Sequence, residues 1–183
     1  IEEHPDACYR GARGIIALTG YDGILGYRTD GSYSAENNTN PEKYYTDDLQ
    51  QKWLDEHPDF DWEQERAEAK KVAEAMKADG WTFASHTWGH KKVGETSYDD
   101  LVADTERWLQ YVSPLIGGTD AIIFAHGEDL TTTGVYDSSV DKYVYLKSKG
   151  FDVYCNVDST RYTTVVTSDY FHQGRRNLDG YRI

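Results

Sequence analysis

The segment FASHTWGHKK, residues 83–92, places two histidines four positions apart, with a tryptophan and a glycine between them. Neutral imidazole is a good ligand for zinc and similar metals, so His86 and His90 are candidate metal ligands. The spacing matches one helical face, as in the zinc-protease motif His-Glu-x-x-His, but Thr87 stands where that motif has its glutamate. We therefore expect the pair on a turn that leaves a strand. The alternative is two unrelated histidines, one packed on Trp88 and one exposed.

The elements around this pair predict an α/β fold with a parallel sheet and helices packed outside. Short apolar runs indicate strands, and segments with apolar residues at helical spacing indicate helices that stop at glycine or proline. We expect strands at 14–20, 81–85, 120–127 and 151–158, helices at 46–56, 61–80, 97–112 and 137–149, and one more strand within 163–171 before a tail.

Other polar groups follow the predicted strands. Tyr21 and Asp22 come after the apolar run GIIALTG, and His126, Glu128 and Asp129 come after the run AIIF. In parallel α/β sheets, ligands bind at the carboxyl ends of the strands. These groups and the histidine pair are therefore expected at one edge of the sheet.

Composition limits the partners of the chain, whose 183 residues fit a single domain over 1–183. The formal net charge of -13 argues against nucleic acid or an anionic membrane, which need clustered lysine and arginine. No apolar run approaches the roughly 18 residues needed to span a bilayer. An uncharged polymer such as a glycan is compatible with this charge. The two cysteines, Cys8 and Cys155, are expected to be free or partly buried thiols.

The ends of the sequence indicate a piece of a longer protein. The chain opens on Ile1, IEEHPD has the pattern of a helix end, and DGYRI provides no closing element. We expect a truncated N-terminus, and the C-terminus is a second candidate for truncation.

The segment AEAMKADGWTFASHTWGHKKVGETSYDDLVADTERWL resembles the second motif of the polysaccharide deacetylases, carbohydrate esterase family 4. In that family a helix ending in glycine leads to a strand, a His-Thr-x-x-His signature and another helix. The resemblance implies that His86 and His90 bind a divalent metal, usually zinc, cobalt or nickel, together with an aspartate. It also implies an incomplete, distorted (β/α) barrel, an acetylated polysaccharide or peptidoglycan-type glycan as partner, and an extracellular or cell-wall location.

The first motif of that family, Thr-Phe-Asp-Asp, supplies the catalytic base and the third metal ligand. It lies on a strand that would precede Ile1, in a missing N-terminal segment of the same protein. The local match LTGYDG has Tyr21 where the first aspartate belongs. Tyr21 and Asp22 are therefore predicted substrate-groove residues, with Trp88 and His126, and metal ligation by Asp22 is the alternative.

The later motifs of the family are matched less closely. The third, Arg-x-Pro-x-Gly, keeps only Gly127, and His126 beside it either stands over the substrate or packs inside. The resemblance makes His172 the candidate general acid, because it is the only later histidine. Arg175 and Arg176 either contact substrate or form a solvated basic pair.

The resemblance predicts hydrolysis of an N- or O-linked acetyl group by metal-activated water. Because the base is missing, we expect this segment alone to be inactive. One alternative is a non-catalytic glycan- or metal-binding relative, and another is an unrelated α/β domain with structural histidines. Imidazole nitrogens more than about 5 Å apart and pointing away from each other would contradict the metal site, because ligand distances are about 2.1 Å.

Overall fold

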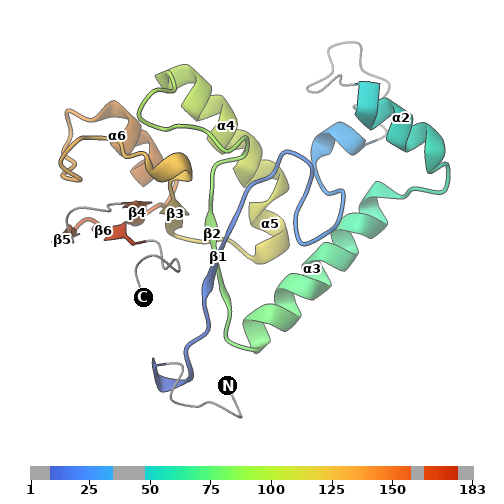
Figure 1. Ribbon diagram of the computed structural model, residues 1–183, viewed down its shortest axis with the longest axis horizontal. Helices are drawn as coiled ribbons and strands as arrows, with labels where there is room; N and C mark the ends of the chain where they lie inside the picture. Colours follow the sequence, from blue (N-terminus) through green and yellow to red (C-terminus); the bar gives the residue numbers. More distant parts are fainter. Residues whose placement is uncertain (1–8, 35–47, 158–162, 177–183) are drawn as a thin grey trace.

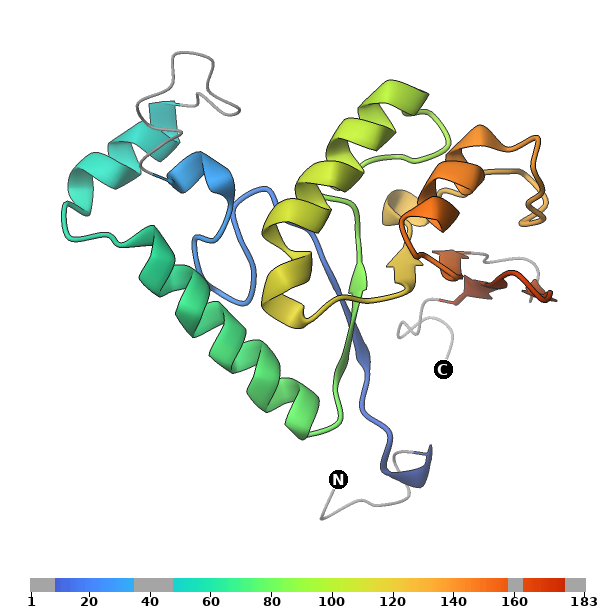
Figure 2. The same ribbon diagram turned by 180° about the vertical axis from the view of Figure 1, so that it is seen from behind.

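The structure is a computed structural model that describes residues 9–34, 48–157 and 163–176 (Figures 1 and 2). Its fold is α/β, as the sequence predicts, with a six-stranded sheet in the order β1-β2-β3-β4-β6-β5. All neighbouring strands pair in parallel except β5, which is antiparallel to β6. The strands are β1 (Ile15–Leu18), β2 (Thr82–Ser85), β3 (Ala121–Ile123), β4 (Val153–Val157), β5 (Thr164–Val166) and β6 (Phe171–Arg175).

The sheet is open, because no pairing joins β5 to β1 within the described ranges. The α-helices are α2 (Asp48–Glu56), α3 (Trp62–Ala78), α4 (Tyr98–Tyr111), α5 (Ser113–Ile116) and α6 (Asp141–Ser148). Short 3₁₀ helices are η2 (Tyr9–Gly11), η3 (Gly31–Tyr33) and η4 (Ala125–Gly127).

Capping residues explain where the two long helices begin. Asp61 accepts a hydrogen bond from Gln64 N at the start of α3, and Ser97 accepts one from Asp100 N at the start of α4. Each side chain satisfies an amide that has no partner inside its helix. At the other end of α3, Gly80 has φ 93°, a conformation that suits glycine, and the chain then turns into β2.

The two faces of the sheet differ. One packs against the helices, and its large buried core includes Leu18, Phe83, Ile122 and Tyr154 from the strands with Ala73, Leu101, Trp108 and Leu146 from the helices. The other face is lined by smaller residues, namely Ala17, Ala84, Ala121, Ile123, Val153 and Cys155. Cys155 is a free thiol whose pKa is raised by burial, and Cys8 lies outside the described residues.

Two predictions about the chain need correction. Residues 163–171 were predicted to hold one strand followed by a tail, but the structure forms a hairpin of β5 and β6, which places His172 inside a strand. The turn is stabilised by hydrogen bonds from Thr167 N to the Tyr170 carbonyl, 3.0 Å, and from Tyr170 N to Thr167 Oγ1, 3.0 Å. Polar residues that favour turns divide the run, which is the physical reason for two strands.

The strand predicted at 120–127 ends at Ile123 and continues as η4. His126 (φ 58°) and Gly127 (φ 75°) both adopt the left-handed conformation, which ends the extended backbone. Helix α5 was not predicted.

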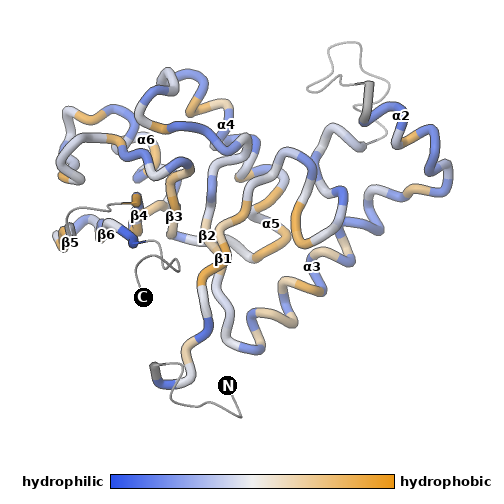
Figure 3. Tube along the Cα trace, viewed as in Figure 1, coloured by the Kyte–Doolittle hydropathy of each residue, from blue (hydrophilic) through white to orange (hydrophobic). Residues whose placement is uncertain are grey.

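Hydropathy along the chain follows this arrangement, with apolar colour concentrated on β1 and α5 and polar colour along much of α2 (Figure 3). Among the residues that the structure describes, no helix is both long and apolar enough to cross a bilayer.

Candidate functional site

Parallel pairing of β1, β2 and β3 brings the segments that follow these strands to one edge of the sheet. Tyr21 and Asp22 follow β1, the histidine pair follows β2, and His126 lies in η4 after β3. A hydrogen bond of 2.9 Å from Gly20 N to the carbonyl of Trp88 joins the first two segments. The segments that follow β1, β2 and β3 therefore lie at the same edge of the sheet, as the order of the elements predicts.

Three histidine rings lie together at this edge, and we call His86, His90 and His126 the edge cluster. The ring centroids of His86 and His90 are 4.9 Å apart, and those of His90 and His126 are 4.3 Å apart. His126 Nε2 donates a hydrogen bond of 3.1 Å to the carbonyl oxygen of His90. The predicted pair is brought together, with a third ring beside it.

Strand β3 fixes the orientation of the His86 ring. Its Nδ1 lies 2.5 Å from the carbonyl oxygen of Ile123. A carbonyl oxygen only accepts, so Nδ1 carries the hydrogen and Nε2 keeps its lone pair in the neutral ring. This second contact of a ring nitrogen is typical of histidines that bind metals.

The electrostatic surroundings favour the neutral form of His86. Burial lowers its pKa below the usual 6.5, and repulsion from His90, Arg175 and His126 adds to the effect, while the hydrogen bond to Ile123 opposes it. At neutral pH His86 is thus the uncharged imidazole that a metal requires.

The backbone around the pair is strained. Thr87, with φ 62°, and His90, with φ 54°, are non-glycine residues in the left-handed region. Such conformations cost of order 1–3 kcal/mol each and persist where the surroundings fix them. Thr87 Oγ1 accepts a hydrogen bond from Lys91 N at 2.7 Å, and Ser85 Oγ accepts one from Thr87 N at 3.2 Å. Local side chains therefore stabilise this turn.

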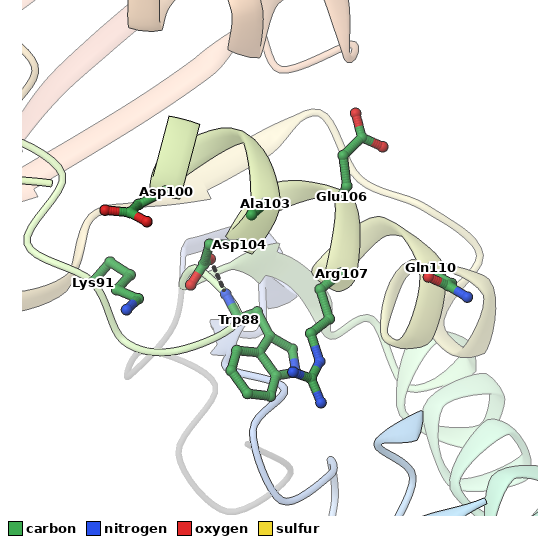
Figure 4. A pocket seen from close by; sticks show the side chains of 8 residues that line it. All are labelled: Trp88, Lys91, Asp100, Ala103, Asp104, Glu106, Arg107 and Gln110. Atoms are coloured by element: carbon green, nitrogen blue, oxygen red, sulfur yellow. Dashed lines mark hydrogen bonds between the residues drawn. The ribbon is translucent and has the colours of Figure 1, made fainter. Parts of the chain in front are cut away.

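Trp88, a predicted groove residue, is held from two sides. Its Nε1 donates to Asp30 Oδ1 at 2.8 Å, and Arg107 Cζ lies 3.8 Å from the centre of an indole ring. Arg107 Nη2 also donates to Asp30 Oδ2 at 2.8 Å, forming an ion pair in which the Asp30 side chain is fully buried. Trp88 lines a cavity of about 380 Å³ along α4 (Figure 4).

Helix α4 also holds the loop between the two histidines. Asp104 Oδ2 accepts a hydrogen bond from Trp88 N at 2.6 Å, and Asp104 Oδ1 accepts one from Gly89 N at 2.8 Å. Burial raises the pKa of the Asp104 carboxyl, although these two hydrogen bonds oppose the shift.

Sequence-based prediction missed both Asp104 and Asp30. Asp104 lies on the buried face of α4 between Leu101 and Trp108, so an acidic residue within an apolar stripe was the available signal. Asp30 lies in a loop without periodicity and gave no comparable signal.

Within the described part of the chain, no hydrogen bond or ion pair joins Tyr21 or Asp22 to the edge cluster. The ring of Tyr21 is exposed, and Asp22 Oδ1 accepts a hydrogen bond of 3.1 Å from Tyr33 Oη. Asp22 also pairs with Arg28 at 3.5 Å. Their predicted role in a groove stays a prediction.

His172 lies in a second group, which we call the inner cluster, made of His172, Asp129 and Tyr136. His172 is 1% exposed and is in register with Tyr154, which packs in the helix-covered core. Its Nε2 lies 3.0 Å from Asp129 Oδ2, yet neither ring nitrogen has a hydrogen-bond partner of good geometry in the described part of the chain. Tyr136 Oη donates to Asp129 Oδ1, and burial next to this carboxylate raises the pKa of Tyr136. His172 thus contacts Asp129 and Tyr136 and not the edge cluster, as far as the described residues show.

The edge cluster fits a metal only in part. A catalytic zinc site usually has three protein ligands and a water. Among residues 9–34, 48–157 and 163–176, no group of three His, Cys, Asp or Glu side chains is arranged to hold a metal ion. The described residues therefore offer His86 and His90 as two candidate ligands and do not complete a site.

The fold and the edge cluster define an α/β protein with an open, mostly parallel sheet and a histidine cluster at the carboxyl ends of its strands. Comparison with models of known protein families, with curated proteins and with solved structures gave no match to this chain.

Proposed function

We propose that the chain is a polysaccharide deacetylase-like hydrolase that removes N- or O-linked acetyl groups from a glycan with the help of a divalent metal. The observation that carries the proposal is the His86–His90 pair at the carboxyl ends of parallel strands, with ring centroids 4.9 Å apart. Zinc is the proposed metal, with cobalt or nickel as alternatives. The open sheet would form part of the distorted (β/α) barrel of that family, and an extracellular or cell-wall location belongs to the same proposal.

In this proposal, residues of the chain prepare the ligands. The Ile123 carbonyl holds the hydrogen of His86 Nδ1 and leaves Nε2 as the ligating atom, and the depressed pKa of His86 keeps the ring uncharged. A divalent metal bound there would polarise the acetyl carbonyl and lower the pKa of a water molecule. Trp88, Tyr21, Asp22 and His126 are the proposed groove residues beside it.

The role of His172 as general acid stays a prediction. A general acid must come within hydrogen-bond reach of the leaving group. His172 is buried beside Asp129, so this role would require the inner cluster to open.

Titration calorimetry with Zn²⁺ on the full chain tests the metal site. We expect binding of one ion, lost in His86→Ala and in His90→Ala and retained in His57→Ala. His57 is a suitable control because it stacks on Trp53 at 4.0 Å, away from the edge cluster. Equal Zn²⁺ affinity in all four proteins would contradict the proposed ligands.

Acetate release from chitooligosaccharides and from acetylxylan tests the reaction. It is measured with this chain and with the entire product of its reading frame, each with Zn²⁺ or Co²⁺. We expect activity from the entire product and its loss in His86→Ala.

The second candidate is a glycan- or metal-binding relative without catalytic activity. The observation that favours it is the incomplete set of ligands among the described residues. Binding of chitooligosaccharide or Zn²⁺ by the entire product, without acetate release, would support this candidate over the first.

A further inference from the structure

The loop between the two histidines has a backbone that its own sequence does not favour. Thr87 is β-branched, and a β-branched residue with positive φ is an outlier that needs support from its surroundings. His90 at the other end of the loop also has positive φ. The positions of both imidazoles therefore depend on what holds the two residues between Thr87 and His90.

Those two residues, Trp88 and Gly89, are held by one carboxylate. Asp104 accepts the backbone N–H of each, with distances of 2.6 Å and 2.8 Å to its two oxygens. Asp104 is 5% exposed, and Figure 4 shows its carboxylate directed from α4 toward the segment that carries Trp88. Hydrogen bonds to an ionised acceptor are shorter and about twice as strong as neutral ones.

The fit between Gly89 and Asp104 is close. A Cβ atom added at Gly89 would lie 3.1 Å from Asp104 Oδ1, which is tighter than nine in ten such contacts. Gly89 does not have a positive φ, so its lack of a side chain is explained by this approach and not by its backbone conformation.

Asp104 is itself placed on a rigid element. Leu101 and Trp108, one turn before and one turn after it, are buried in the core. Trp108 Nε1 donates a hydrogen bond of 2.8 Å to the carbonyl of Leu18 in β1. The carboxylate is thereby fixed relative to the sheet edge from which the histidines emerge.

We infer that Asp104 is a positioning residue for the edge cluster, which fixes the backbone between His86 and His90 and so sets the relation between their imidazoles. The geometric part of this inference is independent of any metal, and its consequence for metal affinity rests on the proposed function.

The test compares Asp104→Asn with Asp99→Asn in the full chain without metal. Asparagine keeps one carbonyl acceptor and turns an NH₂ group toward the second backbone N–H, where no hydrogen bond can form. Asp99 provides a matched control, because the same change removes an exposed carboxylate from the first turn of the same helix.

Amide exchange and imidazole ¹H–¹⁵N spectra provide the readout. In Asp104→Asn we expect exchange of the Trp88 or Gly89 amide to become at least about tenfold faster, as loss of a hydrogen bond to a charged group predicts. The ring resonances of His86 and His90 should shift, and those of His172 should not. Unchanged His86 and His90 resonances in a folded Asp104→Asn protein would overturn the inference, because they would show a role in stability alone.

Gly89→Ala tests the same contact from the loop and remains available should Asp104→Asn fail to fold. Its methyl group would press on Asp104 Oδ1, so we expect shifts of the same two histidine rings. The effects of Gly89→Ala and Asp104→Asn should be non-additive, because the two residues share one contact. Absence of ring shifts in Gly89→Ala, or full additivity in the double variant, would overturn the inference.

Cobalt titration connects the inference to the proposed function. Substitution of residues that orient metal ligands typically lowers affinity 10- to 100-fold, and we expect a loss in this range for Asp104→Asn and none for Asp99→Asn. If the wild-type chain binds no Co²⁺, the proposed metal site fails, while the metal-free spectra still decide whether Asp104 positions the rings.

Discussion

The edge cluster and the inner cluster both contain histidine, but the surroundings of their imidazole rings differ. In the edge cluster, His86 and His126 each donate a hydrogen bond from one ring nitrogen to a backbone carbonyl oxygen. In the inner cluster, His172 lies against Asp129 in the helix-covered core, and its two ring nitrogens are buried without good hydrogen bonds among the described residues. The rings of His86 and His126 are thus oriented by backbone carbonyls, whereas the ring of His172 is enclosed in the core.

Breaking the Asp30–Arg107 ion pair beside Trp88 is expected to give the largest effect on stability. Removing one partner of a buried pair costs about 3–5 kcal/mol of stability, so Asp30→Ala should lower the free energy of unfolding by that amount. Urea denaturation measures the loss, and ¹H–¹⁵N spectra should show that His86 and His90 shift more than His172. Glu68→Ala, which breaks the exposed pair with Lys71, is the control and should change stability little. Equal shifts in both clusters would show that they are not separate.

The next largest effects are opposite changes in two histidine variants, one in Zn²⁺ affinity and one in stability. His86→Ala should weaken Zn²⁺ binding roughly 100-fold or more, because a protein ligand is lost. His172→Ala should leave Zn²⁺ affinity unchanged and lower stability by about 2–3 kcal/mol, because it opens a cavity in the core. Calorimetry and urea denaturation measure the two effects. Loss of Zn²⁺ binding in folded His172→Ala would remove the distinction between the clusters.

The packing of the inner cluster is tested at Gly134. This residue has φ 68°, and a Cβ atom there would lie 2.6 Å from His172 Cε1. Gly134→Ala should destabilise the chain by about 2–3 kcal/mol, from backbone strain together with the clash. Gly118→Ala, with φ 82° and open space around its Cβ, isolates the strain alone at about 1–2 kcal/mol. If the two variants lose the same stability by urea denaturation, the His172 ring is not tightly packed.

The smallest effect is the pH dependence of His86. Its folded-state pKa is lowered by burial, so the unfolded chain binds the proton more readily. The contribution of His86 to stability is then complete above the ordinary pKa of 6.5 and is lost as the pH falls through the lowered value. In EDTA, the free energy of unfolding should fall between pH 7.5 and pH 5 by more in the wild type than in His86→Gln. A steeper fall in the variant would contradict this electrostatic description.

The order of the elements and the location of the site were accessible to sequence-based prediction because they depend on local signals. Apolar runs gave β1 to β4, and the Ser97 cap marked the start of α4. Their parallel pairing then brought the segments with Tyr21, the histidine pair and His126 to one edge, whereas Asp129 lies in the inner cluster. The hairpin of β5 and β6 was missed because its polar turn residues, Ser168 and Asp169, lie inside the short segment 163–171, which was predicted to hold one strand.

The residues that hold the loop between His86 and His90 could not be predicted from local sequence signals in the same way. Asp30 and Arg107 are 77 residues apart, and Asp104 meets Gly89 across 15 residues. Such contacts depend on the packing of α4 against the sheet, which spacing along the chain does not encode. Only the placement of Asp104 on an apolar stripe gave a local sign.

The Leu18 carbonyl at the end of β1 has a consequence for the folding pathway. It accepts hydrogen bonds from His86 N, 2.9 Å, and Trp108 Nε1, 2.8 Å, the latter across 90 residues of chain. Contacts of such long sequence separation form slowly, because a large loop must close before they stabilise anything. We therefore expect a refolding chain to form its local helices before the histidine arrangement at the sheet edge.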